Sequence, residues 1–246
     1  MRFAALRKFP TTEWQLILAA RRRGTQSSAR AVAHVCEAYW YPLYAYLRSV
    51  GRGADEAEDL TQAFFTRLIE KRLIERACPD RGSFRSFLIT SLKNFVASEG
   101  ERSRAMKRGG TIPVSLRVQA AELRYGAEPR DDRRPDRIYE QRWAATLLDR
   151  VLTQLRDEFD ESGKANLFET LKCYLTPGQG NEPYGQLAGR LHMSEGAVGV
   201  AVHRIRQRYR QLLWTEVART IAGPEDEVTE DEVRNEIRYL FSVMRS

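Results

Sequence analysis

The strongest constraint on the fold lies in residues 184–213, which read YGQLAGRLHMSEGAVGVAVHRIRQRYRQLL. Two leucines spaced four apart predict a first helix over residues 184–191 with one apolar face. Ser194 can accept a hydrogen bond from an amide of the following turn, which predicts a second helix that starts at about Glu195. A short helix, a tight turn and a second helix form the helix-turn-helix layout, whose second helix enters the major groove of DNA.

The predicted second helix has two different faces. At about 100° per residue, one stripe is apolar and should pack inward: Val198, Val202, Ile205, Tyr209 and Leu212. The other side is mainly polar and basic: Gly199, Val200, His203, Arg204, Arg206, Gln207 and Arg210. We therefore expect a DNA-binding helix, against the alternative of an ordinary amphipathic hairpin with a solvated basic face.

The composition favours a protein that binds polyanions. The 246 residues suffice for one large domain or two small ones. Forty Lys and Arg against 33 Asp and Glu give a formal charge of +7, which favours attraction to polyanions. Three widely separated cysteines predict a reducing compartment. No signal peptide and no bilayer-length apolar run is present, so we expect a cytoplasmic protein without membrane insertion.

The residues give no sign of catalysis or of a cofactor. The sequence has no Gly-rich phosphate loop, no HExxH and no Gly-x-Ser-x-Gly motif. His34 and Cys36 are the only close His/Cys pair, and two potential ligands do not make a zinc site. We therefore expect no enzyme activity, no metal site and no cofactor.

Helical periodicity predicts helices on both sides of a polar segment. Before it, one helix is predicted to start near Thr12, and three more are predicted over about residues 29–48, 55–71 and 83–105. Residues 109–137 are rich in Gly, Pro and mixed charge and are expected to form a flexible linker. Helical spacing resumes at Ile138, and Thr229 and Glu232 have the spacing of a capping box at the start of a last helix that ends near Met244.

The helix predicted over residues 55–71 begins with DEAEDLTQ, which is unusually acidic for so basic a chain. Carboxylates in the first turn of a helix stabilise it through the helix dipole. Exposed carboxylates can also dock a basic partner. The local chemistry leaves both explanations open.

Three segments in order carry a resemblance to a known family: ADEAEDLTQAFFTRLIEKR, FRSFLITSLKNFVASEGERSR and the helix-turn-helix stretch. They resemble regions 2.2, 2.3 with 2.4, and 4.2 of bacterial RNA polymerase sigma factors of the extracytoplasmic-function (ECF) type, in the sigma-70 superfamily. The resemblance covers nearly all of the chain. The trailing EVARTIAGPEDEVTEDEVRNEIRYLFSVM resembles a C-terminal extension in a sigma branch common in planctomycetes and acidobacteria.

The resemblance implies an all-α fold of two small helical domains. The expected parts are a region 2-like domain over residues 10–108, the flexible linker over 109–137, a region 4-like helix-turn-helix domain over 138–214 and a C-terminal extension over 215–246. We expect the last helix to pack on the region 4-like domain, with a regulatory role as the alternative.

The implied partners are core RNA polymerase and promoter DNA. Region 2.2 docks on the clamp helices of the largest polymerase subunit, and the matching residues here are Asp55, Glu58, Asp59 and Gln62. Single-stranded −10 DNA is read by the next helix, where the best matches are Lys93, Asn94, Phe95, Ser98, Arg102 and Arg104. The resemblance also implies that the second helix of the helix-turn-helix binds the −35 element. Its base-reading positions match Gly199, Val200, His203 and Arg204, and Arg206 with Arg208 or Arg210 would face phosphates or solvent.

Gly199 and Val200 depart from the family pattern, because several members carry polar or basic side chains at those positions. Glycine reads no base, and valine offers only an apolar contact such as one to a thymine methyl group. Gly199 is expected to allow close approach to the DNA backbone instead. The alternative functions are a helix-turn-helix repressor that never contacts polymerase and a nucleic-acid enzyme. An anti-sigma factor, a kinase and the C-terminal helix are alternative regulators.

Overall fold

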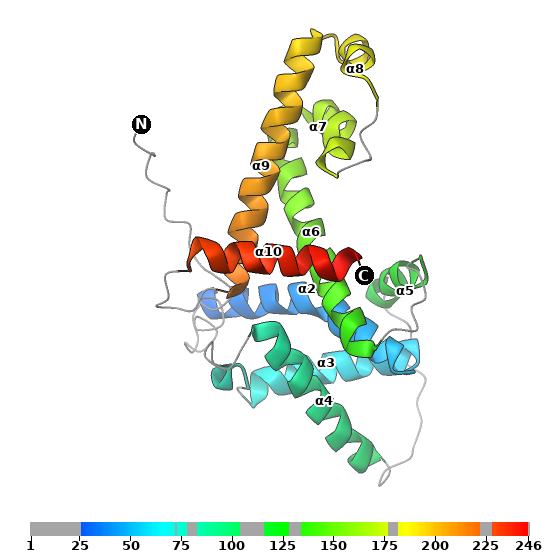
Figure 1. The fold of residues 1–246 in the computed structure, drawn as a ribbon. Helices are drawn as coiled ribbons and strands as arrows, with labels where there is room; N and C mark the ends of the chain where they lie inside the picture. The colour runs from blue at the N-terminus through cyan, green and yellow to red at the C-terminus, as the bar shows by residue number, and fades with distance from the viewer. Residues whose placement is uncertain are drawn as a thin grey trace. The chain divides into compact units, whose positions relative to one another are not determined.

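The computed structural model describes residues 26–71, 73–77, 83–103, 116–127, 134–176, 182–221 and 228–245. These residues form helices and short connections and contain no strand, so the expected all-α fold is confirmed (Figure 1). The chain divides into two compact units. The first consists of Met1–Thr146 with Ala218–Ser246, and the second is Leu147–Val217.

The first unit holds the helices predicted in the front half of the chain. Their bounds are α2 Gln26–Ser49, α3 Ala54–Glu70, the short 3-10 helix η1 Leu73–Arg76 and α4 Phe84–Ser103. The three α-helices lie within a few residues of their predicted ranges, whereas η1 was not predicted. The helix expected to start near Thr12 lies outside the described residues.

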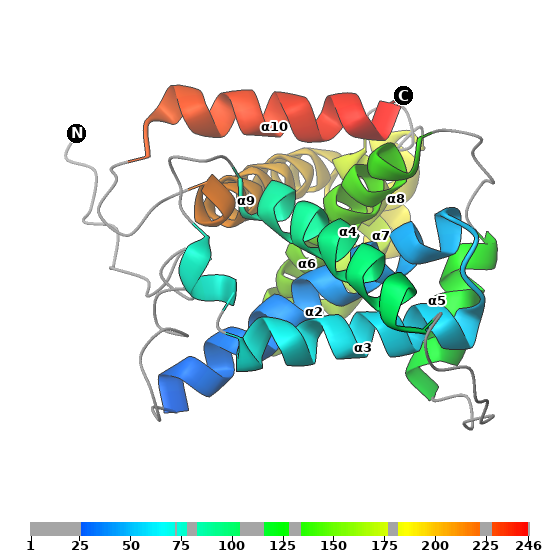
Figure 2. The same ribbon diagram turned by 90° about the horizontal axis from the view of Figure 1, so that it is seen from below.

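Aromatic side chains hold these helices together. Tyr39 of α2 meets Phe84 of α4 edge to face, with ring centroids 5.5 Å apart. Phe64 of α3 packs on Phe95 of α4 at 5.8 Å. All four rings are buried. Figure 2 shows α4 crossing the pair formed by α2 and α3.

The segment expected to be a flexible linker contains a helix, α5 Leu116–Ala127. Glu122 binds α2 through both carboxylate oxygens, because Arg48 Nε lies 2.8 Å from Oε1 and Arg48 Nη2 lies 3.0 Å from Oε2. The hydroxyl of Tyr44 also donates a hydrogen bond to Glu122. The linker prediction is therefore wrong for this segment. It forms a helix that specific polar contacts hold in place, although its composition is typical of a loop.

The last helix, α10 Glu230–Arg245, belongs to the first unit and not to the helix-turn-helix unit as expected. Its predicted capping box is confirmed, since the Thr229 amide donates to Glu232 at 2.8 Å and the Glu232 amide donates to Thr229 Oγ1 at 3.3 Å. Val233, Leu240 and Val243 are buried on its inner face. The Gln141 side chain donates to the Val243 carbonyl at 3.2 Å and ties the helix to α6.

The second unit contains the helix-turn-helix. Helix α6 Pro135–Glu161 begins in the first unit and ends in this one. It is followed by α7 Ala165–Leu171, the 3-10 helix η3 Lys172–Leu175, α8 Tyr184–Leu191 and α9 Glu195–Ile221. The bounds of α8 and the start of α9 are those predicted. Figure 1 shows α8 beside the first turns of α9.

The turn between α8 and α9 is built by three consecutive residues. His192 takes the left-handed conformation, with φ of 51°, at the end of α8. The Met193 amide donates to the Ala188 carbonyl at 3.0 Å, which closes the last turn of α8. Ser194 Oγ accepts from the Ala197 amide at 3.2 Å, as expected of an N-cap.

Gly199 faces α8 across this turn. A Cβ atom at this position would lie 3.7 Å from the ring of Tyr184, an ordinary van der Waals distance. The position that a side chain would occupy at residue 199 therefore faces Tyr184 of the protein. This gives no support to the expectation that Gly199 leaves room for the DNA backbone.

We predict that Glu122→Gln lowers the free energy of unfolding at pH 7 by about 1–2 kcal/mol, because it weakens charge-assisted hydrogen bonds. Burial alone would raise the pKa of Glu122, but the hydrogen bonds from Arg48 and Tyr44 and the Arg48 charge lower it below 4.5. Such a carboxylate stabilises the fold above the unfolded pKa and loses this effect as pH falls through the lower folded pKa.

Urea unfolding, followed by circular dichroism at several pH values between about 3 and 7, measures the effect. The difference between wild type and variant should shrink towards the acid end. Glu37→Gln, at an exposed position of α2, is the control and should leave stability unchanged. A difference that stays constant down to the acid end would contradict the assigned contact.

We also predict that Gly199→Ala stabilises the second unit by about 0.5–1 kcal/mol, because alanine favours a helix interior over glycine. The new methyl group would also contact Tyr184 without a clash. Gly189→Ala, in α8 with no atom within 4 Å of its Cβ position, isolates the helix-propensity part of the effect. Thermal unfolding of both variants measures the difference; a loss of stability at position 199 alone would contradict the described packing.

Candidate polymerase-facing and nucleic-acid-facing surfaces

Helix α3 presents a small acidic surface, which we define as Asp55, Asp59 and Gln62. All three are exposed. Thr61, Phe64 and Leu68 occupy the opposite, buried face of the helix, which explains why the acids point outward. The acidic surface contains three of the four residues that the sequence suggested for polymerase binding.

Glu58, the fourth of these residues, turns inward. Its side chain is only 8% exposed, and Oε1 accepts a hydrogen bond from Gln62 Nε2 at 2.9 Å. Direct contact of Glu58 with a large partner is therefore not favoured by this burial. The structure gives it a supporting role, because its carboxylate orients the amide of Gln62.

Helix α4 brings Lys93 and Asn94 together on the protein surface, where both are exposed. Phe95 does not join them: it is 6% exposed, packs on Phe64, and has the Arg67 guanidinium 5.6 Å from its ring centre. Phe95 was expected among the −10 contacts, but its ring is part of the core and cannot reach DNA from this position.

The remaining −10 candidates are less informative. The Ser98 hydroxyl donates to the Phe95 carbonyl of its own helix at 2.7 Å. Arg102 lies in the last turn of α4, and Arg104 lies outside the described residues.

Asp136 pairs with Lys93, a contact that the sequence did not suggest. Lys93 Nζ lies 2.6 Å from Asp136 Oδ1 and 5.8 Å from the ring centre of Tyr46. Asp136 was missed because it fell within the expected linker. Pro135 was the available signal, since proline favours the first helical position and Asp136 follows it in the first turn.

Helix α9 exposes the side chains expected to contact DNA on one face. Val200 is 50% exposed, and His203, Arg204 and Arg210 are exposed as well. Val198, Val202 and Ile205 are buried on the opposite face, as the periodicity predicted. This face of α9 is therefore exposed to solvent.

Two of the predicted DNA-binding arginines contact the protein itself. Arg206 Nε donates to the Tyr174 carbonyl at 2.8 Å, and Arg208 Nε donates to Glu158 Oε2 at 2.7 Å. The hydrogen bonds to Glu158 raise the pKa of Arg208, as does the Glu158 charge. In this structure these two arginines hold α9 on η3 and α6, which leaves Arg204 and Arg210 as the better placed cations.

Cofactor and membrane features are not found in the described part of the chain. No group of three or more His, Cys, Asp or Glu side chains among those residues could hold a metal ion. None of the described helices is long and apolar enough to cross a bilayer.

Comparison with known proteins finds one family match, and it covers part of the first unit. Residues 37–103, which include α3 and α4, match the family model described as Sigma-70 region 2. No curated protein and no solved structure matches the chain. The matched segment contains both the acidic surface and the pair formed by Lys93 and Asn94. The match of residues 37–103 supports a sigma factor of the sigma-70 family and indicates a role in RNA polymerase binding and promoter melting.

Proposed function

We propose that this protein is a sigma factor of the ECF type that binds core RNA polymerase, recognises a −35 and −10 promoter and helps to melt it, without catalysis of its own. One observation carries the proposal. A sigma-70 region 2 domain is followed, in the same chain, by a capped helix-turn-helix with an exposed basic face. A repressor that acts without polymerase has no use for the first of these parts.

The acidic surface of α3 is the proposed docking site for the clamp helices of the largest polymerase subunit. Asp55 and Asp59 lie one helical turn apart, and both are exposed on a chain whose net charge is +7. A local acidic patch on a basic protein suits a basic protein partner and repels DNA from the same surface. Gln62 adds a polar contact one turn further along the helix.

The exposed pair Lys93 and Asn94 is proposed to contact the −10 strand. An ammonium group can bind a phosphate, and a side-chain amide can hydrogen-bond the edge of an unpaired base. Arg102 and Arg104 follow on the same basic segment and are proposed to extend the contact. Phe95 contributes by packing α4 on α3, which sets the orientation of its two neighbours.

The α9 face is proposed to bind the −35 element in the major groove. Val200, His203 and Arg204 lie in the N-terminal half of the helix, which approaches the base edges in this motif. Arg204 can form a bidentate contact with guanine, and Val200 can contact a thymine methyl group. Arg210, further along, is proposed to bind phosphate.

The two DNA-binding parts are proposed to act as one bivalent site. Each alone makes few contacts, and joint attachment to polymerase raises the effective concentration of the second at its DNA element. We place the protein in the cytoplasm with its polymerase, and in the branch with a C-terminal extension that the sequence resembles. An anti-sigma factor or a kinase is a further proposed partner.

We predict that Asp59→Lys abolishes co-purification with core RNA polymerase, because it reverses the charge at the centre of the acidic surface. Glu70→Lys, at an exposed position in the last turn of α3, makes the same charge change away from the surface and should bind as wild type does. Circular dichroism verifies that both variants fold. Equal polymerase binding by wild type and Asp59→Lys would remove the docking assignment.

We predict that Arg204→Ala weakens promoter binding by the polymerase complex by about 1–3 kcal/mol at its preferred sequence and relaxes the preference at one −35 position. Arg210→Ala is the matched comparison and should weaken binding about equally on every sequence. Binding to promoters with each −35 base changed in turn measures both. Uniform weakening by Arg204→Ala would make that residue a phosphate contact.

A further inference from the structure

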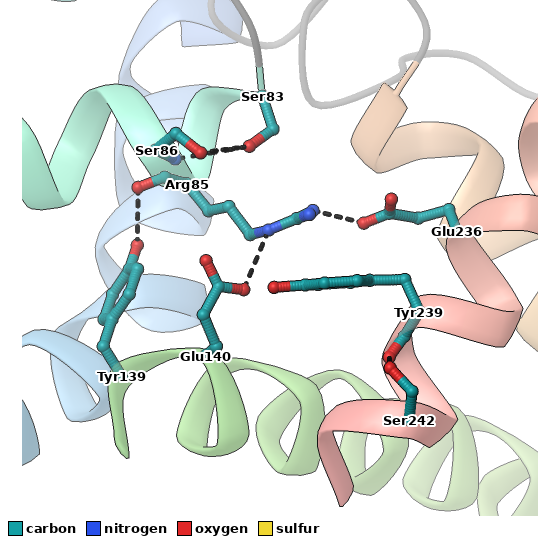
Figure 3. A network of polar contacts seen from close by, with 8 residues as sticks. All are labelled: Ser83, Arg85, Ser86, Tyr139, Glu140, Glu236, Tyr239 and Ser242. Atoms are coloured by element: carbon teal, nitrogen blue, oxygen red, sulfur yellow. Dashed lines mark hydrogen bonds and ion pairs between the residues drawn. The ribbon is translucent and has the colours of Figure 1, made fainter. Parts of the chain in front are cut away.

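The C-terminal helix α10 contacts the rest of the first unit through one buried arginine, Arg85. Arg85, in the first turn of α4, forms an ion pair with Glu236 of α10 and places Nε 3.0 Å from Glu140 Oε2 of α6. Its side chain is only 11% exposed. Figure 3 shows the guanidinium between the two carboxylates, with the Tyr239 ring below it.

Aromatic rings complete the enclosure of Arg85. The guanidinium carbon lies 4.5 Å from the ring centre of Trp143 and 5.0 Å from that of Tyr239, distances that permit cation–π attraction. Burial raises the pKa of Glu140 against the opposing effect of the Arg85 charge. The pKa of Arg85 is raised: burial would lower it, but Glu236 and Glu140 favour the charged form more strongly.

These contacts place the first turn of α6 between α4 and α10. The Tyr139 hydroxyl donates to the Arg85 carbonyl at 3.0 Å, so α6 is fastened to α4 at this point. Gln141 is fastened to α10 through the Val243 carbonyl. Asp136 precedes Tyr139 by three residues and reaches Lys93 of α4. Asp136 therefore reaches Lys93 from a segment of α6 that contacts both α4 and α10.

An opening lies beside the contact between α6 and α10. An open cavity of about 420 Å³ lies there, lined by Asp136, Arg137, Glu140, Tyr239, Ser242 and Val243. Beside this opening, helix α10 keeps its buried residues Leu240 and Val243 and its hydrogen bond from Gln141.

We propose that α10 is a built-in regulator: it holds the first turn of α6 on α4, so that the Asp136 carboxylate occupies Lys93 in place of a DNA phosphate. The inference rests on the proposed role of Lys93 in binding the −10 strand. In the free protein the charge of Lys93 is then neutralised by Asp136. Release of α10 would free Lys93 to bind a phosphate. A carboxylate and a phosphate oxygen compete for the same ammonium group.

The ion pair between Asp136 and Lys93, which we call the mask, is weak enough for DNA to displace. Lys93 and Asp136 are 42% and 63% exposed, and exposed ion pairs stabilise by only a small amount. The mask therefore reduces DNA affinity by about twofold to fivefold. A DNA strand that offers several phosphates to the complex with polymerase overcomes a single carboxylate.

Full-length protein without polymerase tests this proposal by fluorescence anisotropy, with a labelled single-stranded DNA of mixed sequence as the probe. Asp136→Asn removes the competing carboxylate, and Glu236→Gln weakens the grip of α10 on Arg85. Glu230→Gln is the matched control: it makes the same charge change at an exposed position of α10 whose carboxylate pairs with Arg234 of the same helix.

Asp136→Asn should bind the probe about twofold to fivefold more tightly than both wild type and Glu230→Gln. Glu236→Gln should shift affinity in the same direction, and wild-type affinity of the folded variant overturns the role of α10. If that variant does not fold, Gln141→Ala, which removes the hydrogen bond between α6 and α10, takes its place. In a Lys93→Gln background, Asp136→Asn should give no gain, because its effect passes through Lys93. Equal affinities for wild type, Asp136→Asn and Glu230→Gln, including no measurable binding by any of them, overturn the proposal, as does an undiminished gain without Lys93.

Co-purification of the same proteins with core polymerase separates this proposal from the proposed function. Wild-type binding to polymerase with equal DNA affinities rejects the mask alone. Failure of wild type to bind polymerase rejects the sigma-factor function. If wild type does not bind polymerase but Asp136→Asn still gains DNA affinity through Lys93, the proposed masking of Lys93 stands and the protein is another kind of DNA-binding protein.

Discussion

The packing of aromatic rings between α2, α3 and α4 is the interaction on which the rest of the first unit depends. Phe64 and Phe95 meet in this core, and Tyr39 meets Phe84. Because one face of each helix is committed to the core, the other must face outward. The same packing therefore points the acids of α3 and the exposed pair of α4 towards solvent on separate helices, where the proposed protein and DNA contacts do not overlap.

Periodicity and capping predicted the helices well but not their tertiary partners. The capping box at Thr229 and the N-cap at Ser194 are local signals, and both are present in the structure. Helix α5 was missed because it lies in a segment of loop-like composition and its contacts are mainly polar and cation–π. Glu122 binds Arg48, and the Arg124 guanidinium lies 4.2 Å from the ring centre of Tyr41. Among the α5 residues whose burial the structure describes, only Ala121 is buried. Local chemistry carries no information about such long-range polar contacts.

The candidate site residues show the same division. Exposure of Asp59, Lys93 and Arg204 follows from helical phase, which the sequence contains. The inward turn of Glu58 and the pairing of Arg208 with Glu158 depend on neighbours distant in sequence, as does the placement of α10 in the first unit. A buried guanidinium that needs two carboxylates from two other helices could be found only in three dimensions.

The central claim is that this chain directs initiation by core RNA polymerase, and in vitro transcription tests it most directly. Purified core polymerase with the protein, on fragmented genomic DNA, should yield start sites whose upstream sequences share two short motifs at a constant spacing. Those starts should be absent with core polymerase alone. Identical start sites with and without the protein would contradict the account.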